Sequence, residues 1–147
     1  AIVFGDAKSH IISDGEADLL VGFEPSETLR AIRRCNAKSV VVTNLTPLPP
    51  FTVTIGSGVY PDLDELQMLI RNKTKKLIAL DAVKLAKEAG SVLSVNMVLL
   101  GSLIQTDVLP ITAENVKTAI ETKTKKAFVG TNIKAFDLGY SAAELSI

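Results

Sequence analysis

The stretch SVVVTNLTPLPP, residues 39–50, changes from a strand to a proline-rich loop within a few positions. Its valines at 40–42 predict a strand that is buried on both faces, as the strands of a helix-covered parallel sheet are. Asn44 then leads into a run of prolines, and proline both fixes φ at about −65° and removes a backbone donor. The chain therefore leaves its core through a stiff, extended loop at the carboxyl end of a strand.

The rest of the sequence continues the pattern that this stretch begins. Strand-like and helix-like segments alternate as far as residue 90, and helices finish the chain. Apolar runs of strand length lie at 17–23, 39–43, 51–55 and 77–80, and a short hairpin is predicted from 1–4 and 9–12. Such alternation implies parallel strands joined by crossover helices. We expect a three-layer α/β fold with a Rossmann-like, mostly parallel sheet, helices on both faces and a helical C-terminal end.

Capping residues and apolar spacing define the predicted helices. Pro25 suits a first helical turn, and Glu24 before it has the charge that a helix N-terminus favours. Three later helices follow side chains that can cap them, which are Asp62, Asp81 and Thr112. The last helix has one apolar face at helical spacing, made of Val129, Ile133, Phe136 and Tyr140.

The composition indicates one soluble globular domain spanning residues 1–147. Hydrophobic residues make up 47% of the chain and charged residues 22%, which is typical of a folded domain. The formal net charge of +0 gives no broad positive field, so we expect no nucleic-acid and no membrane partner. No apolar run is long enough to span a bilayer and no secretory signal precedes the first strand, which favours a cytoplasmic location.

The scarcity of ligating side chains limits the chemistry of this chain. Cys35 is the single cysteine and His10 the single histidine, so they cannot complete an internal disulfide, an iron–sulfur cluster or a structural zinc site. Cys35 is expected near a helix C-terminus as a small buried thiol. No nucleotide-binding glycine fingerprint, nucleophile elbow or zinc-protease motif occurs in the sequence. The sequence therefore identifies no catalytic residue and no metal ligand.

The segment SVNMVLLGSLIQTDVL, residues 94–109, is apolar almost all round. Its helix should be enclosed by protein, with Gly101 at a close backbone approach. Almost complete burial is expected for Val98, Leu99, Leu103 and Ile104. Ser94 and Asn96 lead this helix, and they form either a capped start with a satisfied amide or a place that holds an anion or an acyl carbonyl.

The tetrapeptide KTKK occurs twice, at residues 73–76 and 123–126, each time after a predicted helix. Lysines in that position offset the negative end of the helix dipole. The alternative interpretation is a patch that binds phosphate or an acidic partner.

Six motifs carry a family resemblance, which are GEADLLVGFEPSETLRAI, NLTPLPPFTV, YPDLDEL, ALDAVKLAKEAG, VNMVLLGSL and FVGTNIKAFDLGY. They resemble the gamma-type domain of 2-oxoacid:ferredoxin oxidoreductases, and its indolepyruvate-type branch most closely. The resemblance runs from residue 2 to residue 140, and six motifs in register make it specific although no single one is decisive. Family members usually begin with a glycine-rich strand–turn–helix unit. The resemblance therefore implies a fragment of this domain that lacks its first βα unit.

The resemblance implies that two chains share the chemistry. In that family a large subunit holds thiamine diphosphate and iron–sulfur clusters and the smaller subunit holds neither, so no cofactor is expected in this chain. The assembled enzyme oxidatively decarboxylates an aryl 2-oxoacid, passes electrons to ferredoxin and makes an acyl-coenzyme A. This chain would meet ferredoxin and coenzyme A through the complex and be inactive alone. Strand edges left open are expected to be covered by another chain, in a hetero-oligomer or a homo-oligomer.

The candidate contact residues lie in the proline loop and at the start of the apolar helix. They are Asn44, Thr46, Pro47, Pro49, Ser94 and Asn96, all expected to face a ligand or the partner subunit. Thr46 departs from the family pattern, in which a basic residue is expected, and this puts an anion contact there in doubt. Two alternatives stay open: the loop is a rigid crossover that touches no ligand, or the chain is a stand-alone nucleotide- or coenzyme A-binding module without a redox partner.

Overall fold

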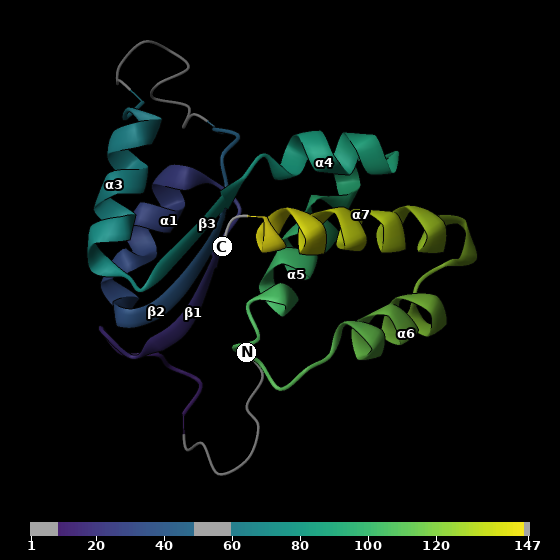
Figure 1. Ribbon diagram of the computed structural model, residues 1–147, viewed down its shortest axis with the longest axis horizontal. Helices are drawn as coiled ribbons and strands as arrows, with labels where there is room; N and C mark the ends of the chain where they lie inside the picture. The colour runs from purple at the N-terminus through teal and green to yellow at the C-terminus, as the bar shows by residue number, and fades with distance from the viewer. Residues whose placement is uncertain (1–8, 49–59, 146–147) are drawn as a thin grey trace.

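The protein is built on a parallel sheet, seen in the computed structural model, which describes residues 9–48 and 60–145 (Figure 1). Within these residues the strands β1 (Ala17–Gly22), β2 (Cys35–Asn44) and β3 (Lys76–Leu80) lie side by side in chain order. The predicted strands at 1–4 and 51–55 lie outside the described residues. The prediction of a strand at 9–12 is wrong, because the Ser9 hydroxyl accepts a hydrogen bond from the Ile11 N–H, 3.0 Å away, in a local turn.

Helices cover both faces of the sheet, which confirms the predicted three layers (Figure 1). One face carries α1 (Pro25–Ala31) and α3 (Leu63–Lys73), and the other carries α4 (Ala82–Ala89), α5 (Val95–Gln105) and α7 (Lys126–Glu144). Helix α6 (Ala113–Lys123) packs mainly on α7, and short 3-10 turns occupy Ile32–Arg34 and Val92–Ser94. The part of the chain that the structure describes contains no helix both long and apolar enough to cross a membrane.

The central strand β2 joins the two halves of the core. Val41 is fully buried in a cluster with Ile70 of α3, and Val42 is fully buried in a second cluster with Val98 and Leu99 of α5. Successive side chains of a strand point to opposite faces, so each valine packs against a different helical layer. The predicted burial of this strand on both faces is confirmed.

Strand β2 begins earlier than the sequence predicts. The Ser39 hydroxyl donates to the Ala17 carbonyl, 2.6 Å away, and accepts from the Asn36 N–H, 2.8 Å away. These two hydrogen bonds hold the strands together where the pairing of β1 and β2 shifts its register. The chain before this shift still pairs with β1, so Cys35 opens a strand. It is also the C-cap of the 3-10 turn Ile32–Arg34, which confirms the expectation that it lies near a helix C-terminus. Cys35 is buried, and this burial raises the pKa of its thiol, which agrees with a structural role.

The predicted N-caps form as the sequence indicates. The Asp62 carboxylate accepts from the N–H groups of the first turn of α3, the Asp81 carboxylate accepts from the Lys84 N–H of α4, and the Thr112 hydroxyl accepts from the Asn115 N–H of α6. Each cap satisfies a backbone donor that the helix itself leaves free. The caps at Asp62 and Asp81 therefore fix where the chain enters the helices on either side of β3.

Helices α5 and α7 meet backbone to backbone. A methyl group added to Gly101 would lie 2.0 Å from the Phe136 carbonyl oxygen, and one added to Gly139 would lie 1.9 Å from the Val98 carbonyl oxygen. The Ser102 hydroxyl joins the helices by donating to the Gly139 carbonyl, 2.8 Å away. The predicted close approach at Gly101 is therefore confirmed.

The predicted burial of four α5 side chains is confirmed for three of them and wrong for the fourth. Val98, Leu99 and Ile104 are buried, whereas Leu103 is only partly buried against the cluster around Phe136. Helix α6 closes this side of the core but packs mainly on α7, so it leaves Leu103 of α5 partly uncovered.

Candidate functional site

Polar residues gather at one edge of the sheet, where the three described strands end. Glu24 follows β1, Asn44 ends β2 and Asp81 follows β3. Parallel strands end at a common edge, and in open α/β sheets ligands and partners meet the loops that leave it. The predicted location of the candidate loop at a carboxyl end of the sheet is therefore correct.

The Asn44 amide ties the three strand ends together. Its Oδ1 accepts from the Ala82 N–H at 3.0 Å and from the Thr46 N–H at 3.3 Å. Its Nδ2 donates to the Phe23 carbonyl at 3.1 Å and to the Thr46 carbonyl at 3.3 Å. The side chain is buried and both ends of its amide are used within the chain, so it shapes the loop and leaves no free polar group for a ligand.

Thr46 ties the proline loop to the start of α4. Its hydroxyl donates to the Asp81 carboxylate, 2.9 Å away, and the same carboxylate caps α4 through the Lys84 N–H. The Lys84 N–H holds the pKa of Asp81 below its ordinary value against the opposing effect of burial, and the Thr46 hydroxyl adds to this lowering. Pro47, next along the loop, is half-buried, and Pro49 lies outside the described residues.

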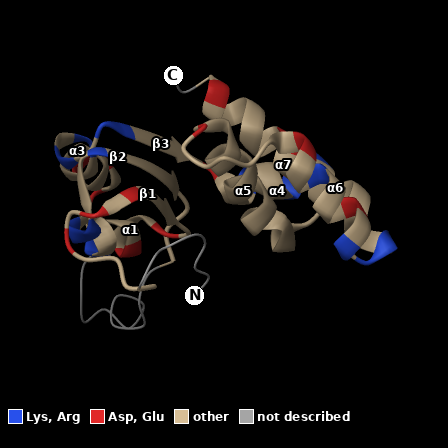
Figure 2. Ribbon diagram, turned by 90° about the horizontal axis from the view of Figure 1, so that it is seen from below, with Lys and Arg blue, Asp and Glu red and all other residues tan. Residues whose placement is uncertain are grey.

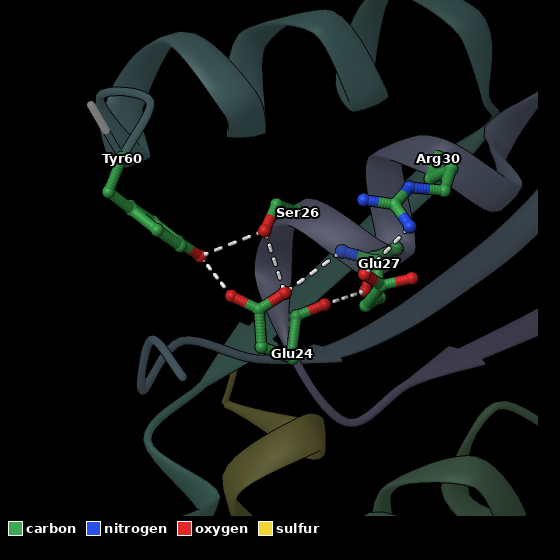
Figure 3. A network of polar contacts seen from close by, with 6 residues as sticks. Glu24, Ser26, Glu27, Arg30 and Tyr60 are labelled. Atoms are coloured by element: carbon green, nitrogen blue, oxygen red, sulfur yellow. Dashed lines mark hydrogen bonds and ion pairs between the residues drawn. The ribbon is translucent and has the colours of Figure 1, made fainter. Parts of the chain in front are cut away.

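Glu24 is the centre of a buried polar cluster at the same edge (Figure 3). Its carboxylate accepts from the Glu27 N–H at 2.9 Å, from the Ser26 hydroxyl at 2.8 Å and from the Tyr60 hydroxyl. Only 6% of the Glu24 surface is exposed. Tyr60 precedes α3 and Glu24 precedes α1, so the cluster joins the two helices that cover one face of the sheet.

The protonation of this cluster follows from its hydrogen bonds. Burial raises the pKa of Glu24, but hydrogen bonds from Tyr60, the Glu27 N–H, Ser26 and the Leu48 N–H outweigh burial and hold it below its ordinary value. Burial and the Glu24 carboxylate both raise the pKa of Tyr60, so its hydroxyl stays protonated and donates. An ionised carboxylate that accepts from so many donors is a poor proton acceptor, and we assign Glu24 an anchoring role.

Replacing the Glu24 carboxylate tests this assignment through pH. Glu24→Gln should lower the free energy of unfolding at about pH 7 by roughly 2 kcal/mol, because charge-assisted hydrogen bonds are lost. The pKa of Glu24 is lower in the folded state than in the unfolded state, so its contribution is present at neutral pH and is lost as pH falls through the folded-state pKa. The difference between wild type and variant should therefore shrink in acid, as measured by denaturant unfolding at several pH values.

Glu27→Gln is the matched control for that experiment. The Glu27 side chain is largely exposed and pairs with Arg30 on the same turn, at 3.2 Å. Its removal should change the free energy of unfolding by about 0.5 kcal/mol or less. A difference between wild type and Glu24→Gln that stays constant from neutral pH into acid would contradict the anchoring role of an ionised Glu24.

Ser94 and Asn96 lie away from this edge. The buried Ser94 hydroxyl donates to Asn132 Oδ1, 3.1 Å away, and does not cap α5, while Asn96 is exposed. The interpretation as a capped start with a satisfied amide is therefore wrong. Both residues line a surface hollow of about 420 Å³ where α4 ends and where α5 and α7 begin. The eight residues of α4, a length of about 12 Å, separate this hollow from the Asn44 amide, which binds the first N–H of α4.

The comparisons with known proteins identify the family. A profile described as Pyruvate ferredoxin/flavodoxin oxidoreductase matches residues 1–142. The chain belongs to the pyruvate ferredoxin/flavodoxin oxidoreductase family. The predicted resemblance to a 2-oxoacid:ferredoxin oxidoreductase domain is thereby confirmed, together with the oxidoreductase class of the subunit.

Relatives within the pyruvate ferredoxin/flavodoxin oxidoreductase family match nearly the whole chain. The indolepyruvate oxidoreductase subunit IorB of Pyrococcus horikoshii is 41% identical over 143 residues, which cover 96% of this chain and 71% of the relative. The subunit IorB of Thermococcus kodakarensis is 37% identical over 140 residues, which cover 95% of this chain and 69% of the relative. These matches confirm the indolepyruvate-type branch that the sequence motifs indicated.

A solved structure agrees with the fold. The crystal structure of a keto/oxoacid ferredoxin oxidoreductase gamma subunit from Geobacter sulfurreducens matches with a TM-score of 0.62, covering 92% of this chain and 69% of that chain. The two sequences are 22% identical, so this likeness shows the fold alone.

Two residues of the polar cluster at this edge of the sheet are not indicated by the sequence. From the sequence, Glu24 is expected only to complement a helix dipole, and no pattern predicts a role for Tyr60. They are 36 positions apart, and no local pattern indicates that they meet. The signal that the sequence does contain is a carboxylate directly before Pro25 at a predicted helix start, where the helix dipole favours an acidic group and backbone N–H groups are free to be accepted.

Proposed function

We propose that this chain is the subunit without redox centres of an enzyme that oxidatively decarboxylates indolepyruvate or another aryl 2-oxoacid to an acyl-coenzyme A and passes the electrons to ferredoxin. The observation that carries the proposal is the 41% identity, over 96% of this chain, to a protein named indolepyruvate oxidoreductase subunit IorB. The family resemblance adds a large partner subunit that binds thiamine diphosphate and iron–sulfur clusters.

The residues of this chain support a role without a resident cofactor. A [4Fe–4S] or [2Fe–2S] cluster needs about four thiolate ligands, and the sequence contains Cys35 alone. Cys35 is buried with a raised pKa, which is the opposite of what a thiolate ligand or nucleophile needs. Glu24, the buried carboxylate at the strand ends, is ionised and already fully hydrogen-bonded. The chemistry is therefore assigned to groups on the partner.

The carboxyl edge of the sheet is suited to present a fixed surface to that partner. The Asn44 amide and the Glu24 carboxylate hold the backbone at this edge, so the loops lose little conformational freedom on docking. Beside these anchors the side chains of Phe23 and Leu48 are exposed although they are large and apolar. We assign the loop that begins at Asn44 to the contact with the large subunit, with Thr46 and Pro47 on its described part.

Co-expression with the large subunit of the same enzyme tests this proposal. The chain should co-purify with that subunit, and the complex should form an acyl-coenzyme A from indolepyruvate while reducing ferredoxin. The chain alone should show neither turnover nor the visible absorbance of a cluster after reconstitution with iron and sulfide. Asn96→Ala should lower turnover of the complex or its coenzyme A affinity while leaving the melting temperature of the chain unchanged, because Asn96 is exposed.

Two results would count against the proposal. Failure of the chain to associate with the large subunit would remove the assigned function and favour the stand-alone nucleotide- or coenzyme A-binding module. A Pro49→Gly variant that keeps full assembly and turnover would remove the role of the loop, since that change costs the folded chain only about 1 kcal/mol or less.

A further inference from the structure

Large apolar side chains surround the hollow beside Asn96 at the corner where α4 ends and where α5 and α7 begin. Leu93 is 85% exposed, Phe128 is 55% exposed and Val92 is 49% exposed. Leu93 and Phe128 line the hollow directly, Leu93 from the turn before α5 and Phe128 from the first turn of α7. Clustered apolar side chains of this size at a surface depression indicate a protein–protein contact more often than a bare surface.

The lysines at this corner give its rim a positive charge. The second KTKK was interpreted as an offset for a helix C-terminus, and this holds for Lys123, the last residue of α6. Lys125 and Lys126 follow the end of α6 as well, but they also open the next helix, because Lys125 is the N-cap of α7 and Lys126 is its first residue. Figure 2 shows this corner between α6 and α7 in blue, away from the sheet.

Nothing within the described chain neutralises these lysines. The first turn of α7 contains no acidic residue, and its N-cap makes no side-chain hydrogen bond. The flanking helices carry Glu88 in the last turn of α4 and Glu121 in the last turn of α6, and no ion pair within the described residues joins either of them to the lysines. Positive charge at the start of a helix is disfavoured by the dipole, so an acidic group from outside would be stabilised here.

We propose that this corner docks a segment of the large subunit that carries apolar side chains beside acidic ones. An apolar side chain of the partner fills the hollow between Leu93 and Phe128, and its carboxylates lie against Lys125 and Lys126. The proposal rests on the proposed function, because it assigns a second contact to the same partner. A second copy of this chain fits less well, since the lysines of two such corners would repel each other across a two-fold axis.

Two double variants separate the apolar and the charged parts of the contact. Leu93→Ser with Phe128→Ser removes the apolar rim, and Lys125→Glu with Lys126→Glu reverses the charge. Each should raise the Kd for the large subunit by about tenfold or more, measured by calorimetric titration at roughly 0.15 M salt. The lysine variant should also weaken the salt dependence of binding, and it should keep or raise the melting temperature of the chain, because acidic residues suit a helix N-terminus.

Matched controls lie elsewhere on the same chain. Leu145→Ser removes an apolar side chain that is 88% exposed, just beyond the other end of α7. Lys73→Glu with Lys75→Glu reverses exposed lysines of the first KTKK, at the corner between α3 and β3 (Figure 2). Both controls should leave the Kd within about twofold of wild type.

The outcomes distinguish this inference from the proposed function. Wild-type affinity in both corner variants, with normal assembly of the unmodified chain, would overturn the inference and leave the proposed function standing. Loss of a dimer of the chain alone, seen by sedimentation in the corner variants, would assign the corner to a second copy and overturn it as well. If the corner variants raised the KM for coenzyme A but kept their affinity for the large subunit, that result would also overturn the inference. Absence of any binding by the unmodified chain would overturn both.

Discussion

Gly139→Ala is expected to lower the free energy of unfolding by about 3 kcal/mol or more, the largest loss that we expect from a one-methyl change. The added methyl group would lie 1.9 Å from the Val98 carbonyl oxygen, and the nearest atoms are backbone, which cannot turn away as a side chain can. Helices α5 and α7 must then separate, and the hydrogen bond from Ser102 to the Gly139 carbonyl is lost with their contact. Denaturant unfolding at neutral pH measures the loss.

The same helix supplies the control for that experiment. A methyl group added to Gly130 of α7 would meet no atom within 4 Å. Gly130→Ala should therefore raise the free energy of unfolding by up to about 1 kcal/mol, because alanine favours a helix over glycine. Equal effects of the two changes, in size and sign, would show that α5 and α7 do not pack through their backbones.

Leu99→Ala is expected to cost about 2–5 kcal/mol, the range measured for deletion of a buried leucine side chain. Leu99 is fully buried in the cluster that joins α5 and α7 to the sheet through Val42. The surrounding helices are held by the glycine contact described above, so the cavity cannot collapse readily.

Leu145→Ala is the matched control, because that side chain is 88% exposed. It should change the free energy of unfolding by about 0.5 kcal/mol or less. A loss below roughly 0.5 kcal/mol for Leu99→Ala as well would contradict the central place of α5 in the core.

The fold could be predicted where the signal is local. The valines before Asn44 specify a strand with two buried faces, and Val41 and Val42 are both fully buried. The helix starts after Asp62, Asp81 and Thr112 are likewise local, because a cap depends on a side chain and the N–H groups a few residues later. These features need no knowledge of what packs against them.

The features that failed depend on distant partners. The early start of β2 follows from the Ser39 hydroxyl reaching the Ala17 carbonyl, 22 positions away. The cluster of Glu24 and Tyr60 joins one residue that precedes β2 in the sequence to one that follows it. For the candidate site, the sequence predicts that the Asn44 loop lies at the sheet edge. It does not indicate that the Asn44 amide makes all its hydrogen bonds to backbone groups that follow the three strands.

Helix α4 sets the distance between the two surfaces assigned to the partner. Its first N–H is bound by Asn44 at the sheet edge, and its last residue leads into Gly90, with φ of 116°, on the wall of the hollow. A partner that has engaged one surface is therefore held within about 12 Å of the other, and the second contact becomes an intramolecular step. Two individually weak contacts can then give a complex that dissociates slowly, and a helix longer by one turn would forfeit that gain while both surfaces remained intact.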